Sequence, residues 1–278
     1  MRAAPLVAVI GHFEWVTHTH GEVPVPGQIV HLHDAAEGPA GGGAVTAAEI
    51  TRLRADCRFY TAVGDDGFGV ASAPLLAAHG IDVRAAQRQG SHPRALTIVD
   101  ASGERTILVT GERMSPTMDD PLPWSDLAAC DGVYFIGDDP RTLIAARTAR
   151  HLVVTARRLP ALIASGVRAD VLVASATDKD EVIDPGRLPV LPRAMVFTEG
   201  ERGGRIVVDG VERRYAAVAV PGPVVDTYGA GDCFAGGLTL GLARGFGLDE
   251  AAALAARCGA RALTWRGGLG PIAAVLAE

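Results

Sequence analysis

The sequence predicts an α/β protein with a doubly wound, mostly parallel sheet, and three observations support this prediction. Short β-type runs alternate with helical stretches along most of the 278 residues. Several of these runs, including 132–136 and 171–174, are apolar throughout, which indicates strands with both faces buried. Hydrophobic residues make up 48% of the chain and charged residues 21%, which is typical of a globular protein rather than a disordered or fibrous one.

The expected elements alternate in chain order. The first strand is the apolar run 5–10, which is much shorter than the roughly 20 residues of a membrane span and is also too short for a secretory signal segment. The later strand-like runs are 57–63, 95–99, 105–109, 132–136, 152–155, 171–174, 194–198 and 216–220. The helical stretches between them are 43–54, 69–79, 140–150, 230–244 and 249–264. Asp209-Gly210 predicts a further hairpin over 205–215.

Two segments interrupt this alternation and predict a small β-sheet lid. The first segment covers about residues 12–40, of which 21–40 are rich in Pro, Gly and His and contain a short β-like patch at 28–33. Residues 83–110 contain two strand-like runs on either side of a turn at 100–103. We expect both segments to form a lid over a substrate cleft. Because the chain shows no internal repeat and no low-complexity linker, residues 1–278 are predicted to form a single domain that carries this lid.

Charge and cysteine usage exclude some classes of protein. The formal charge of −6 argues against a protein that binds the nucleic-acid backbone. Lys179 is the only lysine, so any phosphate chemistry must rely on arginine, backbone amides, helix dipoles or a metal ion. The four cysteines are widely spaced and form no CxxC pair, which favours a reduced, cytoplasmic protein over a disulfide framework or a zinc site.

The stretch VVDTYGAGDCFAGG (224–237) is the most informative part of the sequence. It opens a helix that is apolar nearly all round, and the small residues Gly229-Ala230-Gly231 leave the first backbone amides accessible. These amides would form an anion hole for a phosphoryl group. A carboxylate at Asp232 is then useful if it accepts a proton from an attacking hydroxyl, and Asp226 is a second acid suited to indirect metal or water contact. Alternatively, both acids are helix caps and the glycines serve packing only.

The same stretch resembles the C-terminal signature of the ribokinase/PfkB family of carbohydrate and nucleoside kinases. Four other segments resemble family motifs in the same order, so that the likeness extends over about residues 5–277. These are GGGAVTAAEITRL (41–53), YTAVGDDGFG (60–69), RALTIVDASGERTI (94–107) and TEGERGG (198–204). The resemblance implies a ribokinase-like three-layer α/β/α fold with a small β-sheet lid.

The resemblance also implies a reaction, the ATP-dependent phosphorylation of a hydroxymethyl group on a sugar-like or nucleoside molecule with Mg²⁺ as cofactor. Asp232 would be the catalytic base. The remaining roles that it implies are an anion hole from Gly229, Ala230 and Gly231, a nucleotide site from Thr198, Gly200, Gly203, Asp226 and Thr227, and an acceptor site from Glu14, Gly41, Gly42, Thr46 and Asp232.

The acceptor half departs from the family pattern at two positions. Val16 stands where ribokinase-like members have an Asp that binds sugar hydroxyls, and Glu14 is the nearest acid. Thr46 stands where sugar kinases often have Asn, and a hydroxyl cannot reproduce the hydrogen bonds of an amide. Since buried polar sites reject ligands that leave their groups unpaired, these changes predict an acceptor other than ribose.

The metal motif of the family, Asn-x-x-Glu, is replaced here by SATD (175–178). Asp178 is the predicted residue for holding Mg²⁺ through water, with Asp180 or Glu181 as substitutes. Alternatively, metal handling is weakened and the protein is a pseudokinase that binds ATP and sugar without efficient turnover.

Other polar and aromatic residues leave alternatives open. The histidines could bind a metal ion, stand as polar positions on a lid strand, or contact substrate; they are His12, His18, His20, His31 and His33. Trp15 packs in the lid or stacks on a base or sugar, and Arg105 is expected to be an exposed charge rather than a residue that crosses the cleft. Exposed lid edges predict a homodimer formed through the lid.

Overall fold

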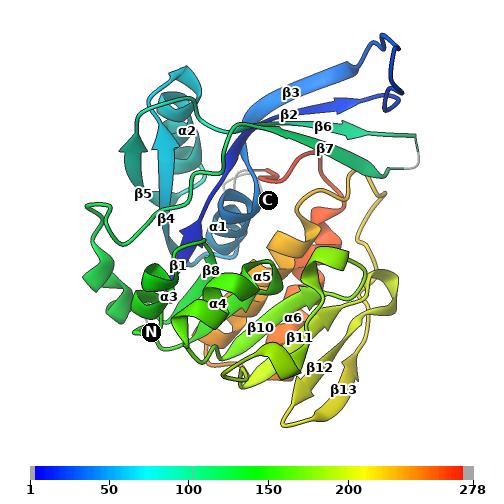
Figure 1. The fold of residues 1–278 in the computed structure, drawn as a ribbon. Helices are drawn as coiled ribbons and strands as arrows, with labels where there is room; N and C mark the ends of the chain where they lie inside the picture. The colour runs from blue at the N-terminus through cyan, green and yellow to red at the C-terminus, as the bar shows by residue number, and fades with distance from the viewer. Residues whose placement is uncertain (1–3, 102, 272–278) are drawn as a thin grey trace.

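The computed structural model describes residues 4–101 and 103–271 and contains two sheets (Figure 1). The main sheet has the strand order β13-β12-β11-β10-β9-β8-β1-β4-β5. Neighbouring strands from β5 to β11 are parallel, while β11, β12 and β13 pair antiparallel. Its strands are β1 (Leu6–Gly11), β4 (Asp56–Gly64), β5 (Ile81–Arg88), β8 (Gly132–Ile136), β9 (Leu152–Thr155), β10 (Val171–Ser175), β11 (Ala194–Thr198), β12 (Gly204–Val208) and β13 (Val211–Tyr215).

The second sheet, which we call the lid sheet, has the order β3-β2-β6-β7 and projects from one end of the main sheet (Figure 1). Its strands are β2 (Glu14–His20), β3 (His33–Ala40), β6 (Arg94–Val99) and β7 (Arg105–Thr110). Both predicted lid segments contribute to it. The segment 83–110 is nevertheless divided between the sheets, because residues 83–88 belong to β5, which pairs with β4 in the main sheet.

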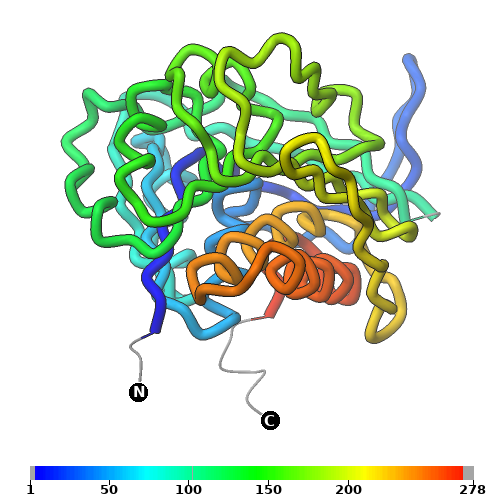
Figure 2. The backbone as a smooth tube through the Cα atoms, turned by 90° about the horizontal axis from the view of Figure 1, so that it is seen from below, coloured from blue at the N-terminus to red at the C-terminus, as the bar shows by residue number. Residues whose placement is uncertain are grey.

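Helices cover both faces of the main sheet, and Figure 2 shows α5 and α6 in orange and red on the side opposite the green α3 and α4. The helices are α1 (Gly42–Arg52), α2 (Gly67–Ala78), α3 (Pro140–Ala146), α4 (Leu159–Ser165), α5 (Ala230–Ala243) and α6 (Leu248–Ala262). Short 3₁₀ turns are η1 (Trp124–Ala129), η2 (Ala156–Arg158), η3 (Lys179–Glu181), η4 (Pro185–Arg187) and η5 (Gly200–Arg202). The α/β/α layering predicted from the sequence is confirmed.

Alternate residues of the central strands enter two separate cores. Val7 and Val9 of β1 pack on the side of α1, α5 and α6, whereas Ala8 and Ile10 pack on the side of α3 and α4. Both faces of β1 are therefore buried, which explains the continuous apolar run. Helix α5 lies between the sheet and α6, and a Cβ on Gly237 would lie only 2.7 Å from the Cys258 sulfur. This close packing fixes the position at which α5 begins.

Several sequence-based expectations are wrong in detail. Residues 28–33 do not form a strand before His33, where pairing with β2 begins. Residues 216–220 are not a strand either, because β12 begins at Gly204 opposite Tyr215 and leaves 216–220 without a partner. The helix expected over 140–150 ends at Ala146. The sequence reasoning also missed β2, β3, β5 and α4 as separate elements.

Candidate active site

The candidate site lies where strands of the main sheet end at their carboxyl edge. The chain leaves β1 toward β4 on one side of the sheet, while β8 and the later strands extend to the other side, so that β1 and β8 flank the point where the strand order reverses. Open α/β sheets bind ligands in the crevice outside such a point. The polar residues that follow these strand ends are His12 and Glu14 after β1, Asp138 after β8, Arg157 and Arg158 after β9, and Asp178 after β10.

The start of α5 presents free backbone donors to this crevice. Gly229 is the N-cap in a left-handed conformation (φ 78°), and its carbonyl accepts from the Cys233 N–H. The N–H groups of Ala230, Gly231 and Asp232 have no hydrogen-bond acceptor among residues 4–101 and 103–271. Gly231 is exposed, and a Cβ on it would meet nothing within 4 Å, so the first turn of α5 is open at this position. The geometry suits an anion at the positive end of a helix dipole.

Asp232 lies in the first turn of α5, beside the glycine pair of α1. A Cβ on Gly42 would approach its Oδ1 to 3.0 Å. Burial raises the pKa of Asp232 to about 6, against the opposing effect of Arg105 and Arg157. Thr46 is fully buried, and its hydroxyl donates to the Asp232 carbonyl over 3.2 Å. Thr46 therefore anchors the first turn of α5 to α1. Its side chain was predicted to contact an acceptor, but its hydroxyl is used in this hydrogen bond.

Glu14 occupies the space that a side chain at position 41 would need. A Cβ on Gly41 would lie 2.1 Å from the Glu14 Oε2, and Gly41 has φ 90°, so only glycine suits this position. Burial raises the pKa of Glu14 to about 7, with Arg113 lowering it and Asp232 raising it further. Glu14 and Asp232 thus contact adjacent glycines and face one region of the site. Val16 is fully buried on β2 and contributes no polar group there.

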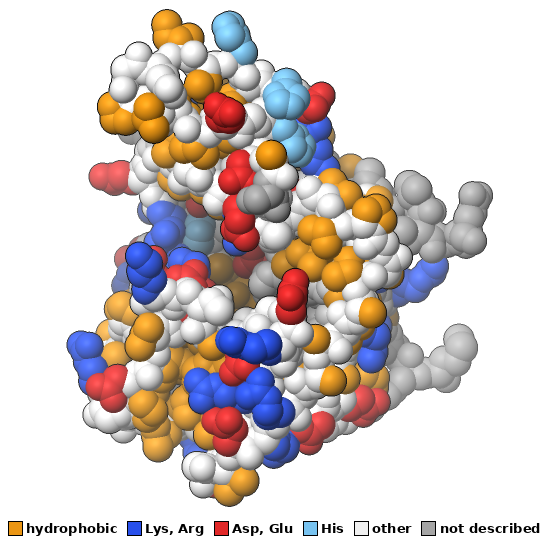
Figure 3. Space-filling model, turned by 90° about the vertical axis from the view of Figure 1, so that its right-hand side faces the viewer, with side chains coloured by type: hydrophobic (Ala, Val, Ile, Leu, Met, Phe, Trp, Pro, Cys, Tyr) orange, Lys and Arg blue, Asp and Glu red, His pale blue; other side chains and the backbone are white. Residues whose placement is uncertain are grey.

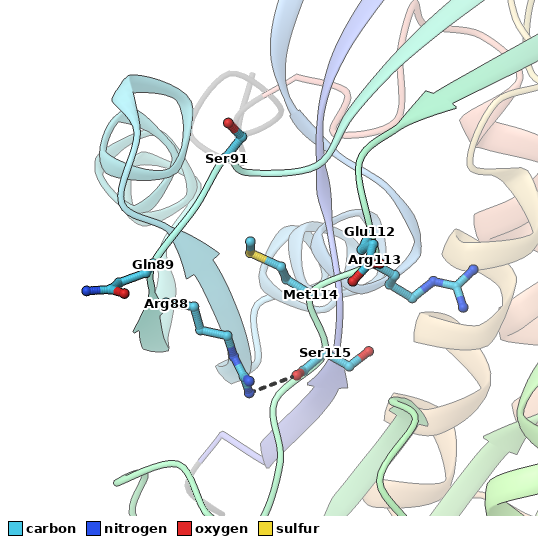
Figure 4. A pocket seen from close by; sticks show the side chains of 7 residues that line it. All are labelled: Arg88, Gln89, Ser91, Glu112, Arg113, Met114 and Ser115. Carbon is cyan, nitrogen blue, oxygen red and sulfur yellow. Dashed lines mark hydrogen bonds between the residues drawn. The ribbon is translucent and has the colours of Figure 1, made fainter.

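Two arginines and one aspartate border the same region, and the sequence reasoning missed all three. Asp138 Oδ1 lies 3.5 Å from Arg158 Nη1 and 3.7 Å from Arg113 Nη1, so two guanidinium groups share one carboxylate. In Figure 4, Arg113 points away from the 250 Å³ hollow between the segments 88–91 and 112–115 and toward α5. For Arg158, the sequence did contain a signal. Arg157 and Arg158 directly follow an apolar strand in a chain that has a single lysine.

The predicted nucleotide loop forms a tight turn after β11. Thr198 ends this strand, and the Glu199 N–H donates to the Gly203 carbonyl over 2.8 Å. A Cβ on Gly203 would lie 2.3 Å from the Tyr215 carbonyl oxygen, so the hairpin with β13 excludes a side chain there. Gly200 faces open space, since a Cβ on it would meet nothing within 4 Å. The turn keeps one accessible backbone surface at the carboxyl edge of the sheet.

Asp226 and Thr227 have different positions from those expected. Asp226 is 1% exposed, and its carboxylate accepts from the Tyr228 N–H over 2.8 Å and from the Gly267 N–H over 3.0 Å. It therefore joins the loop before α5 to the segment around Gly267. Thr227 Oγ1 accepts a 2.8 Å hydrogen bond from Arg105 Nη1 on β7 of the lid sheet. Arg105 is exposed on β7, as expected, and this hydrogen bond also joins the lid sheet to the loop before α5.

Asp178 and Glu181 lie at the end of β10 and share Arg157. Asp178 forms an ion pair with Arg157 and accepts from the Asp180 N–H over 2.9 Å. Glu181 accepts from the Ser175 N–H over 2.6 Å and lies 2.8 Å from Arg157 Nε. Both Arg157 and Glu181 contribute to the electrostatics of Asp232. The two acids and one arginine therefore form a mixed-charge group that acts electrostatically on Asp232.

Comparison with known proteins decides the family. The chain matches the pfkB family carbohydrate kinases over residues 4–158 and 170–273, and these two ranges include every site residue described above. The chain belongs to the PfkB family of carbohydrate kinases. It is therefore a phosphotransferase, as the resemblance of its motifs implied.

Individual proteins similar to this chain are kinases of sugars, in agreement with the family. The acarbose 7(IV)-phosphotransferase of Actinoplanes sp. is 29% identical over 281 residues, which cover 87% of this chain and 86% of that protein. The fructokinase of Escherichia coli is 26% identical over 270 residues, covering 83% and 87%. The crystal structure of ribokinase from Thermotoga maritima superposes with a TM-score of 0.75 at 19% identity and covers 97% of both chains. The ribokinase-like fold is thereby confirmed.

The histidines of this PfkB kinase are dispersed. His12 is buried beside Arg158, His18 is buried against Tyr228, and the His20 ring lies 6.2 Å from that of His33 in the lid sheet. Figure 3 shows pale-blue histidines on the upper part of the molecule. A hollow lies between this upper part and the rest of the molecule. Within the described ranges, no three His, Cys, Asp or Glu side chains are grouped closely enough to hold a metal ion. No helix in those ranges is long and apolar enough to cross a membrane.

Proposed function

We propose that this PfkB kinase transfers the γ-phosphoryl group of ATP to a hydroxymethyl group of a sugar or sugar-like acceptor, with Asp232 as general base. The observation that carries the proposal is the arrangement at the start of α5. Three unbonded N–H groups face open space over Gly231, and a carboxylate of raised pKa stands beside them. An anion hole next to a proton acceptor is what in-line phosphoryl transfer to a hydroxyl requires.

Each group of site residues has a separate role in this reaction. The N–H groups of Ala230, Gly231 and Asp232 bind the oxygens of the transferring group, with Gly229 shaping the turn before them. The Asp232 carboxylate takes the proton of the acceptor hydroxyl as its oxygen bonds to phosphorus and ADP leaves. Thr198, Gly200 and Gly203 border the nucleotide on the side of β11. Gly41 and Gly42, which lack side chains, let the acceptor reach Asp232 beside Glu14. Arg105 connects the lid sheet to the loop before α5 through its hydrogen bond to Thr227.

The residues at the end of β10 fit a hydrated Mg²⁺ ion. Asp178 and Glu181 supply carboxylate oxygens, and their contacts with Arg157 and backbone N–H groups leave lone pairs for water ligands. Mg²⁺ retains several waters and takes one or two carboxylates together with substrate phosphates. Bound with ATP, it would neutralise phosphate charge. We propose Asp178 and Glu181 together for this contact, with Arg157 holding both side chains in place.

A sugar is favoured over a nucleoside as the acceptor. Trp15, which was the candidate for stacking on a base, packs its ring against Phe68 with centroids 5.3 Å apart. Glu14, Asp232 and the arginines offer polar groups instead, and these match the hydroxyls of a sugar. The names of the relatives from Actinoplanes and Escherichia coli, an acarbose phosphotransferase and a fructokinase, support the same class of acceptor.

The position of the new phosphate tests this function. The protein is incubated with Mg·ATP and individual hexoses, pentoses, oligosaccharides and nucleosides, and the products are followed by phosphorus-31 NMR without proton decoupling. We expect a phosphomonoester split into a triplet by the two protons of a CH₂ group, on a sugar. A doublet would place the phosphate on a ring carbon and contradict the hydroxymethyl acceptor. ATP binding with no product from any compound would indicate the pseudokinase instead.

The pH dependence of the reaction follows from Asp232. A base must be ionised, and burial raises the pKa of Asp232 in the ligand-free protein to about 6, so kcat/KM for the acceptor should fall as the pH is lowered through this value. We expect about half of the plateau value near pH 6 at acceptor concentrations well below KM and saturating Mg·ATP, measured by ADP release between pH 4.5 and 8. A rate that stays constant down to pH 4.5 would be incompatible with the raised pKa.

We also propose a homodimer formed through the lid sheet. Strand β7 is an edge of this sheet, and Leu108, at its centre, is 49% exposed beside the exposed Ile107 and Val109. An apolar edge strand of this kind is a template for pairing with another chain. Light scattering at micromolar protein should give twice the chain mass, and Leu108→Lys should give the chain mass. A monomeric wild type would contradict the proposal. The cytoplasmic location remains a prediction.

A further inference from the structure

Four side chains form a row beside the acceptor region near the ends of β1, β8 and β9. In order, the row consists of Glu14, His12, Arg158 and Asp138. His12 Nε2 lies 3.5 Å from Glu14 Oε1, and His12 Nδ1 lies 3.5 Å from Arg158 Nη2. Arg158 Nη1 lies 3.5 Å from Asp138 Oδ1 at the other end of the row. Arg158 is further held by its Nε, which donates to the Ile136 carbonyl over 2.9 Å. The mechanism proposed above uses Glu14 but assigns nothing to His12 or Arg158.

Hydrogen-bond chemistry gives the row a direction. A guanidinium carries only donors, so the His12 Nδ1 that faces Arg158 acts as an acceptor. Burial, together with Arg158 and Arg113, lowers the pKa of His12 to about 3 against the opposing effects of Asp138 and the Ile136 backbone, so the ring is neutral. With Nδ1 as the acceptor, we place the single ring proton on Nε2. Nε2 lies 3.5 Å from Glu14 Oε1, so its N–H is within reach of this oxygen and can hold it by donating to it.

The second oxygen of Glu14 remains available to a ligand. Oε2 lies against Gly41, next to the Gly42 position that adjoins Asp232. Among residues 4–101 and 103–271, His12 is the only side chain in polar contact with the Glu14 carboxyl group. The charged groups that face this carboxyl are Arg113 from the segment after β7, Arg158 from the end of β9 and Asp232 from α5. Both arginines favour its ionised form.

We propose that His12 and Arg158 are positioning residues for the acceptor, which hold one oxygen of Glu14 so that the other accepts a hydrogen bond from an acceptor hydroxyl beside Asp232. The inference rests on the proposed function, since it assigns the use of Glu14 in that site. Fixing the carboxyl group before binding avoids ordering it during binding, so the row contributes to acceptor affinity. It makes no contact with the reacting atoms, so the chemical step itself should change little.

Two measurements test this role, and one of them does not depend on turnover. The Glu14 carboxyl group is titrated by carbon-13 NMR in the ligand-free protein, with its signal assigned through Glu14→Gln. Its pKa is raised to about 7 in the wild type. His12→Leu and Arg158→Met remove, respectively, a donor and a cation that stabilise the ionised form, so both should move the titration to higher pH. The exposed Arg113→Gln should move it in the same direction and is the variant least expected to disturb folding.

The kinetic measurement separates acceptor binding from chemistry. With the best sugar from the product screen, His12→Leu should raise the acceptor KM about tenfold, the loss expected for one hydrogen bond to a charged group. The KM for ATP and kcat should remain within about twofold. His12→Gln keeps an N–H that can reach Glu14 and should restore most of the acceptor KM. His151→Leu, a half-buried histidine at the start of β9 outside the site, is the matched control and should leave all three constants unchanged.

Defined results would overturn the proposal. A Glu14 titration that is the same in the wild type, His12→Leu and Arg158→Met would show that the row does not act on this carboxyl group, whatever the effect of Arg113→Gln. Equal losses in kcat and in both KM values for His12→Leu and His12→Gln, together with lower melting temperatures, would show a purely structural role. A wild type that phosphorylates no sugar would refute the proposed function, whereas the titration would still decide whether His12 and Arg158 control Glu14.

Discussion

Asp232→Asn should lower kcat by about 10²- to 10⁴-fold, the contribution of a positioned general base, while ATP still binds. The amide has the shape of the carboxylate but cannot take the proton of the acceptor hydroxyl. The rate is measured by ADP release at saturating acceptor, and ATP binding by calorimetry. Asp209→Asn is the matched control, since Asp209 is exposed in a turn of left-handed conformation that Asn also adopts, and it should keep the wild-type rate.

Thermal melting distinguishes this loss of chemistry from a loss of structure. The pKa of Asp232 is raised from 3.8 to about 6 in the folded protein, so the stability of the protonated form is present below pH 3.8 and is lost as the pH rises through 6. Asn cannot ionise, so the variant should melt at or above the wild-type temperature at pH 8. A variant that keeps its kcat would show that another group accepts the proton. A variant that melts much lower would show that Asp232 supports the fold.

Gly231→Ala should lower kcat by about 10²-fold without weakening the fold. Its Cβ would enter the open space in front of the unbonded amides of α5, where we place the transferring phosphoryl group. Because Ala is favoured over Gly within helices by up to about 1 kcal/mol, the melting temperature should not fall. This combination of lower activity and unchanged or higher stability is specific to a methyl group that blocks a ligand rather than one that collides with protein atoms.

Gly67→Ala provides the matched control for this substitution. Gly67 is the first residue of α2, is exposed, and likewise has nothing within 4 Å of a built Cβ. The control should reproduce the effect on melting temperature and leave kcat unchanged. If Gly231→Ala turned over at the wild-type rate, the phosphoryl group could not lie against these amides, and the anion hole would have to be sought elsewhere in the site.

Local sequence was sufficient for the elements whose signal is local. The apolar runs of β1, β8 and β10 are strands because both faces are buried, and the small residues around Gly229 mark the start of α5. Strand β2 was missed because EWVTHTH is largely polar, and it is a strand because β3 and β6 pair with it on both sides. Its pairing involves residues distant in sequence, which a pattern in one segment does not show.

The parts of the site that were missed depend on long-range placement. Asp138 and Arg158 follow different strands and meet only because parallel strands end at one edge of the sheet. The contact between Arg105 and Thr227 joins residues 122 apart and depends on where the lid sheet lies over the body. Asp226 has the residue type of a ligand-binding acid, yet it accepts a hydrogen bond from the N–H of Gly267, 41 residues later in the chain. Such roles follow from tertiary contacts rather than from residue type.

The most direct test of the account is ADP release from Mg·ATP across a panel of sugars, oligosaccharides and nucleosides, measured side by side for the wild type and Asp232→Asn. The account predicts strong release with one sugar or a small group of related sugars, and a rate reduced at least about 100-fold in the variant. Equal rates in the two proteins would contradict the assignment of Asp232 as the base. Release with nucleosides but with no sugar would contradict the acceptor class.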